Sequence, residues 1–154
     1  MIRGGRSHRD YDVLAVALAL GAVFIYAGAD KIRNPLQFAD SIAAFAILPT
    51  MFIDPLALGL PTFEVACGLL LVAPRTRRFG ALALALSSAL FFLALVSALL
   101  RGLTLDCGCF GIGTPSRPRM WLELGLDAIL FGGSLFVYLR SLGATKAAGA
   151  EPFI

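Results

Sequence analysis

Residues 79–100, FGALALALSSALFFLALVSALL, form an apolar run of 22 residues that contains no charged side chain. At a rise of about 1.5 Å per residue, a helix of this length is about 33 Å long, which is enough to cross the roughly 30 Å hydrocarbon core of a bilayer. The run therefore predicts a transmembrane helix.

The composition of the whole chain also indicates a membrane protein. Its 154 residues are 58% hydrophobic and only 15% charged, whereas about a quarter of the residues in soluble domains are charged. The net charge is only +3, and the basic residues are scattered among loops and do not gather into a stripe that could follow phosphates. We therefore expect the lipid bilayer as the surroundings of this protein and no nucleic acid as a partner.

Three further apolar runs, residues 13–29, 55–73 and 120–139, predict three more spans. The first also resembles a signal peptide, because arginines precede it and Ala27-Gly28-Ala29 resembles a cleavage site, but it is longer than the usual apolar region of about 7 to 15 residues. Between the first two spans, residues 36–48 carry apolar side chains on one helical face and end at Pro49, which predicts a short interfacial helix. The predicted fold is all-α: a polytopic four-transmembrane-helix bundle with one interfacial helix in the first outer loop.

The chain has room for one domain, residues 1–140, and the polar, alanine-rich residues 141–154 predict a disordered tail. Within the spans, two glycine pairs recur seven residues apart, Gly21 with Gly28 and Gly125 with Gly132. Each pair lies on one helical face, where a neighbouring helix can approach closely.

The distribution of Lys and Arg predicts the orientation in the membrane. One side carries eight: Arg3, Arg6, Arg9, Arg75, Arg77, Arg78, Arg140 and Lys146. The other carries five: Lys31, Arg33, Arg101, Arg117 and Arg119. We therefore expect a multi-pass protein of the inner (plasma) membrane with both termini in the cytoplasm and residues 101–119 on the oxidising, periplasmic side.

That outer loop contains Cys107 and Cys109, separated by one glycine. A disulfide that closes so small a ring is forced in its geometry, and strained disulfides are the more easily reduced ones. The spacing fits a thiol-disulfide exchange site, but it also fits a static bridge or two idle thiols. A zinc site is not expected, because the only histidine, His8, lies on the opposite side.

Ionisable residues inside a membrane are costly and usually functional. Glu64, Glu123 and Asp127 fall in the outer halves of the second and fourth spans, and Asp30, Lys31 and Arg101 end their helices at the same membrane face. They predict a polar pocket that opens outward beneath the cysteine loop. The alternative is a set of interhelical ion pairs that fix the packing. Cys67, three residues after Glu64, is expected to act as a small hydrophobe and not as a catalyst.

Three segments resemble a known family: residues 28–32 (GADKI), residues 61–64 (PTFE) and above all residues 106–111 (DCGCFG). They look like the methylamine utilisation protein MauE and the wider DoxX group, over roughly residues 13–140. The resemblance implies a four-helix inner-membrane protein linked to maturation of the disulfide-rich small subunit of methylamine dehydrogenase, alongside a thioredoxin-like partner. DoxX relatives are linked instead to sulfur oxidation and thiol redox defence.

The first functional hypothesis is therefore thiol-disulfide exchange by Cys107 and Cys109 with a periplasmic thioredoxin-like protein or a disulfide-rich client. The alternative is a DoxX-like subunit of a membrane redox complex, either non-catalytic or linked to a quinone. Membrane oxidants of the DsbB and vitamin K epoxide reductase type use two cysteine pairs, and only one pair is present here. A quinone, with its headgroup near Glu64, Asp127 or Arg101, is accordingly the second choice, and no other cofactor is expected.

Overall fold

The computed structural model describes residues 8–106 and 116–148, and all of their regular secondary structure is helical. The four long helices are α1 (His8–Arg33), α3 (Ile53–Val72), α4 (Arg77–Leu100) and α5 (Arg117–Ala148). The two short ones are α2 (Pro35–Ala44) and the 3-10 helix η1 (Thr50–Phe52). Four helices are long and apolar enough to cross a membrane, so the predicted all-α fold with four spans is confirmed.

The helices are longer than most of the predicted spans. The prediction counted only apolar residues, whereas the helices continue into the polar residues that flank the apolar runs. The largest difference is at α5, which continues past residue 139 to Ala148. Most of the segment predicted to be a disordered tail is therefore helical, in keeping with its alanine content.

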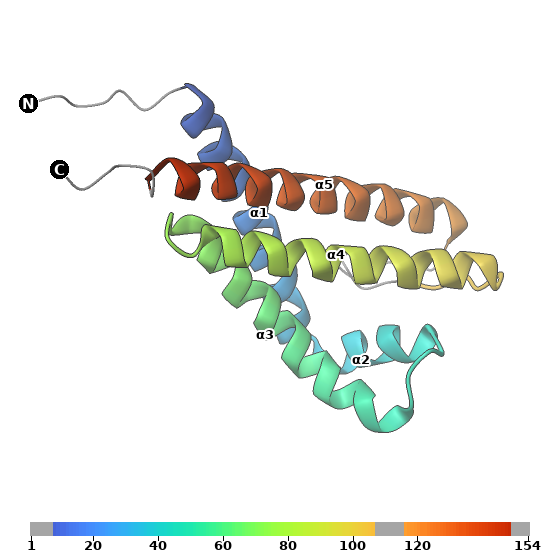
Figure 1. The fold of residues 1–154 in the computed structure, drawn as a ribbon. Coiled ribbons are helices and arrows are strands. Elements are labelled where there is room, and N and C mark those ends of the chain that lie inside the picture. The colour runs from blue at the N-terminus through green and yellow to red at the C-terminus, as the bar shows by residue number, and fades with distance from the viewer. Residues whose placement is uncertain (1–7, 107–115, 149–154) are drawn as a thin grey trace, which may run out of the picture.

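The long helices pack as two main pairs, α1 with α3 and α4 with α5, and α3 and α4 join the pairs. The start of α1, the turn between α3 and α4 and the end of α5 lie at one end of the bundle (Figure 1). The end of α4, the start of α5 and α2 lie at the opposite end, which we call the loop end (Figure 1).

Glycines allow α1 and α3 to approach closely. A Cβ atom on Gly21 would lie 2.9 Å from the carbonyl oxygen of Gly68, and one on Gly28 would lie 2.9 Å from that of Pro61. The prediction for this glycine pair is confirmed. The prediction for Gly125 and Gly132 is wrong, because a Cβ atom on either would meet no atom of the described residues within 4 Å.

Helix α2 packs its apolar face against the bundle. Phe38 and Ile42 are buried and cluster with Ala57 of α3, while Gln37 and Asp40 are exposed. The helix ends at Ala44, earlier than the predicted residue 48, and Ala46 has a φ of 49°. The chain thus leaves the helix before Pro49, by a left-handed residue that no glycine or proline marks.

Candidate functional site

A buried ion pair joins α1 to α3 near the loop end. The Nζ atom of Lys31 lies 2.8 Å from Oε2 of Glu64, and the two residues are 5% and 2% exposed. The same ammonium group lies 5.1 Å from the ring centre of Phe38 on α2 and 5.2 Å from that of Phe91 on α4. The carboxylate and the two aromatic faces compensate part of the cost of burying this cation. Lys31 therefore contacts three neighbouring helices at once.

Asp127 of α5 completes a small polar cavity beside this pair. The cavity has a volume of about 20 Å³ and is lined by Val23, Phe24, Ala27, Lys31, Glu64, Ser88, Phe91 and Asp127. This volume has room for about one water molecule. Oδ2 of Asp127 and the hydroxyl of Ser88 are both buried and have no hydrogen-bond partner among the described residues. A bridging water would satisfy both groups.

A row of ionisable side chains leads from this cavity to the loop end along α5. Glu123 lies one helical turn before Asp127 and is 3% exposed. Its Oε1 atom accepts a hydrogen bond from Nε of Arg119 at 3.0 Å, and the same Nε lies 3.7 Å from Oδ1 of Asp106. Asp106, Arg119, Glu123 and Asp127 thus form an ionic row that begins at the residue immediately before Cys107.

The structure brings together only part of the predicted polar pocket. Lys31, Glu64 and Asp127 share one cavity, and Glu123 lies beside it on α5. Asp30 is half-buried and does not line the cavity.

Arg101 was predicted to join the carboxylates. It does not, and it is exposed. Its guanidinium group donates hydrogen bonds to the backbone carbonyls of Phe45, Ala46 and Ser97. It thereby ties the end of α4 to the segment after α2.

Arg119 was not among the predicted site residues. Its distance of four positions from Glu123 is the spacing of a helical ion pair, so the sequence carried a signal for this contact. Ser88 carried no such signal, because a serine within an apolar helix is most simply explained by packing.

Cys67 is buried in the core with Leu20, Leu71 and Leu84, as expected of a small apolar side chain. Cys107 and Cys109 lie outside the described residues. The chain is well packed just before them, because Leu105 is buried against Leu95 and Met120.

Comparison with known proteins assigns the sequence to a family. A sequence model of the methylamine utilisation protein MauE matches residues 9–140. The chain belongs to the MauE family. No solved structure is significantly similar to it.

Two MauE relatives illustrate the extent of the similarity. The MauE protein of Paracoccus denitrificans is 34% identical over 138 residues, which cover 89% of this chain and 74% of that protein. The MauE protein of Methylophilus methylotrophus is 32% identical over 118 residues, which cover 76% of this chain but 57% of that protein. The predicted resemblance to MauE is confirmed, and the wider relation to DoxX stays a prediction.

Proposed function

We propose that this protein is an integral membrane thiol-disulfide exchange protein of methylamine utilisation. Cys107 and Cys109 would face the periplasm and exchange a disulfide with a thioredoxin-like protein or a disulfide-rich client. In the exchange, a thiolate of one protein attacks the disulfide of the other, and a mixed disulfide forms. The second thiolate of the attacking protein then attacks this mixed disulfide and releases the other protein. The attacking protein thereby gains a disulfide, and the other protein gains two thiols.

The observation that carries this proposal is the ion pair between Asp106 and Arg119. It ties the residue before Cys107 to the first turn of α5, and Arg119 is itself fixed by the buried Glu123. The base of the cysteine loop therefore rests on a packed ionic row, which favours a defined presentation of the two cysteines to a partner. Membership of the MauE family supports the link to methylamine utilisation, which the names of its relatives state.

The distribution of Lys and Arg supports the compartment proposed for the cysteine loop. The loop end carries fewer basic residues than the opposite end, which favours the periplasm of an inner membrane for the loop end and the cytoplasm for both termini. A disulfide persists in that oxidising compartment.

The rival function is that of a non-catalytic subunit that recruits or stabilises a partner complex. In that case the two cysteines form a static clip. Both functions place the loop outside, so they differ in what the cysteines do and not in the topology.

The first experiment uses a Cys67→Ser variant, in which only Cys107 and Cys109 remain as thiols. Intact cells are treated with a membrane-impermeant maleimide, with and without prior mild reduction. We expect labelling only after reduction, as for a reducible disulfide on the periplasmic side. Labelling that requires cell lysis would place the loop in the cytoplasm and overturn the proposal.

The second experiment separates exchange from a static clip. Cys107→Ser and Cys109→Ser are each expected to abolish oxidation or reduction of the partner while the partner complex still forms. Cys67→Ser is the matched control and is expected to keep both. If these variants no longer form the partner complex but the free protein still exchanges disulfides, the static clip is favoured.

A further inference from the structure

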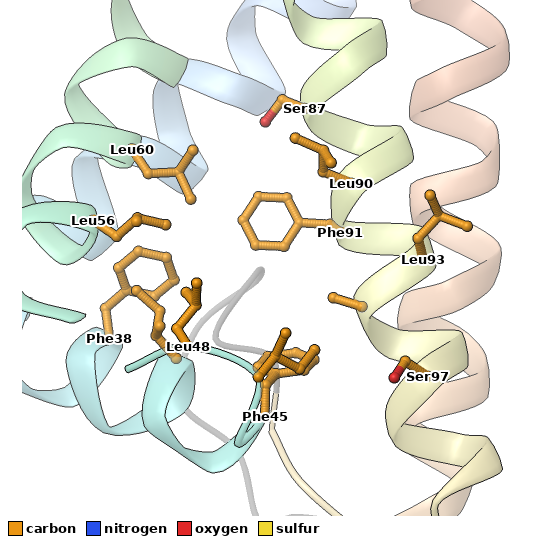
Figure 2. A pocket seen from close by; sticks show the side chains of 13 residues that line it. Phe38, Phe45, Leu48, Leu56, Leu60, Ser87, Leu90, Phe91, Leu93 and Ser97 are labelled. Atoms are coloured by element: carbon orange, nitrogen blue, oxygen red, sulfur yellow. The ribbon is translucent and has the colours of Figure 1, made fainter. Parts of the chain in front are cut away.

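A second, much larger cavity lies between α2, α3 and α4. Its volume is about 530 Å³, within the roughly 300 to 1,000 Å³ of small-molecule sites. Figure 2 shows Phe91 pointing into it from α4, opposite Phe38 of α2 and the leucines Leu56 and Leu60 of α3. Its walls are almost entirely apolar, so they fit an apolar, membrane-soluble occupant.

One buried polar group interrupts this apolar wall. Ser87 of α4 lines the cavity and is 5% exposed, and its hydroxyl has no hydrogen-bond partner among the described residues. Its oxygen points toward the cavity (Figure 2). A buried hydroxyl without a partner is costly, and an acyl chain offers no acceptor for it. A carbonyl oxygen of a ligand would satisfy it.

The aromatic residues narrow the chemistry of the occupant further. Phe91 is part-exposed and provides a ring against which a flat ring can pack, while Phe38 and Phe45 line the cavity but are themselves buried. Phe91 also lines the small polar cavity of Lys31, Glu64 and Asp127. A ring bound beside Phe91 and Ser87 would therefore lie next to the buried charges, while the leucines would surround an apolar chain.

We propose that this cavity binds one lipid-soluble quinone, with a ring carbonyl accepting a hydrogen bond from Ser87 and the isoprenoid chain among the leucines. A quinone combines the three features that the walls require: a flat ring, a carbonyl acceptor and an apolar chain. The proposal concerns binding alone and does not depend on the exchange proposed for Cys107 and Cys109.

The test measures equilibrium binding of decylbenzoquinone and decylbenzene to the purified full-length protein in detergent. The two probes share the apolar chain and the ring, and only the first has carbonyl oxygens. We expect saturable binding of one decylbenzoquinone per chain and binding of decylbenzene that is about tenfold weaker or less. Equal binding of both probes would mean that the cavity takes any apolar chain, and would overturn the proposal.

Two substitutions test whether the quinone binds beside Ser87. Ser87→Ala is expected to weaken decylbenzoquinone binding by about three- to tenfold and to leave decylbenzene binding unchanged. Ser134→Ala is the matched control, because Ser134 is also a buried serine with no hydrogen-bond partner within the described ranges but does not line this cavity. Equal effects of the two substitutions would contradict the assignment of Ser87.

A third variant fills the cavity. Ala94→Phe adds a ring to the cavity wall and is expected to abolish binding of both probes. Leu86→Phe enlarges an exposed residue of the same helix outside the cavity and is expected to bind normally. Full binding by a folded Ala94→Phe protein would show that the quinone binds elsewhere.

Discussion

The ammonium of Lys31 and the carboxylate of Glu64 lie 2.8 Å apart inside the bundle, although 33 positions separate the two residues in the chain. The pair joins α1 to α3, the same two helices that approach closely at Gly21 and Gly68. Because both side chains are buried, removal of either one takes the counterion at 2.8 Å away from the other charge in a medium of low dielectric constant.

Lys31→Met and Glu64→Gln are each expected to lower the free energy of unfolding by about 3–5 kcal/mol. The double variant removes both charges together, so it is expected to recover much of that loss. Unfolding of the purified protein from mild detergent by increasing SDS measures all three variants.

Arg33→Met is the control for this prediction. Arg33 lies in the same last turn of α1 but is exposed, so its replacement is expected to change the free energy of unfolding by less than about 1 kcal/mol. If the effects of the two single substitutions simply add in the double variant, the ion pair does not couple the two helices.

The sequence predicted the carboxylates better than it predicted their partners. The depth of Glu64 and Asp127 in the membrane follows from local counting along an apolar run, and both do line one cavity. By the same counting along the chain, Lys31 and Arg101 were equally good candidates for the partner of these carboxylates. The choice between them depends on tertiary structure, because Arg101 instead binds the carbonyls of Phe45 and Ala46. Those carbonyls are available only because α2 ends at Ala44, and no proline or glycine marks that end.

Gly21→Ala tests the close approach of α1 and α3. The added Cβ would lie 2.9 Å from the carbonyl oxygen of Gly68, so the two helices must move apart. We expect a loss of about 1–3 kcal/mol in the free energy of unfolding, measured by the same SDS titration. Gly132→Ala adds the same methyl group to α5, where no atom in the described part of the chain lies within 4 Å, and is expected to be neutral or slightly stabilising. Equal losses in both variants would show that α1 and α3 do not depend on the glycine contact.

Arg119→Gln tests whether the ionic row positions the cysteine loop. The substitution removes the charge that pairs with Asp106 and with the buried Glu123. If the row fixes the base of the loop, the rate of disulfide exchange with the partner is expected to fall between about tenfold and a hundredfold. The rate is measured as the appearance of oxidised partner in a quenched time course.

Arg117→Gln is the matched control for Arg119, because Arg117 is exposed two residues earlier on the same helix. It is expected to exchange at the normal rate. An Arg119→Gln protein that unfolds more easily but exchanges as fast as the parent would show that the ionic row is structural only.

The two contacts of Arg119 differ in how far the sequence could predict them. The contact with Glu123 follows from a spacing of four residues within one helix. The contact with Asp106 requires the chain to turn back between α4 and α5, and a loop rich in glycine and proline leaves that path undetermined. The helical part of the row was therefore predictable and its link to the cysteine loop was not.

Cys67 is expected to be unreactive in the folded protein. It is buried in the core, and α4 approaches its backbone so closely that a Cβ atom on Gly80 would lie 2.8 Å from its carbonyl oxygen. In a variant that carries Cys107→Ser and Cys109→Ser, N-ethylmaleimide is expected to label Cys67 at least about tenfold more slowly in mild detergent than after unfolding in SDS, because labelling requires a local opening of the core. The measurement is the mass increase of the protein over time. Equal rates in the two conditions would mean that Cys67 is accessible in the native state, and a third thiol would then have to be considered in the exchange proposed for the cysteine loop.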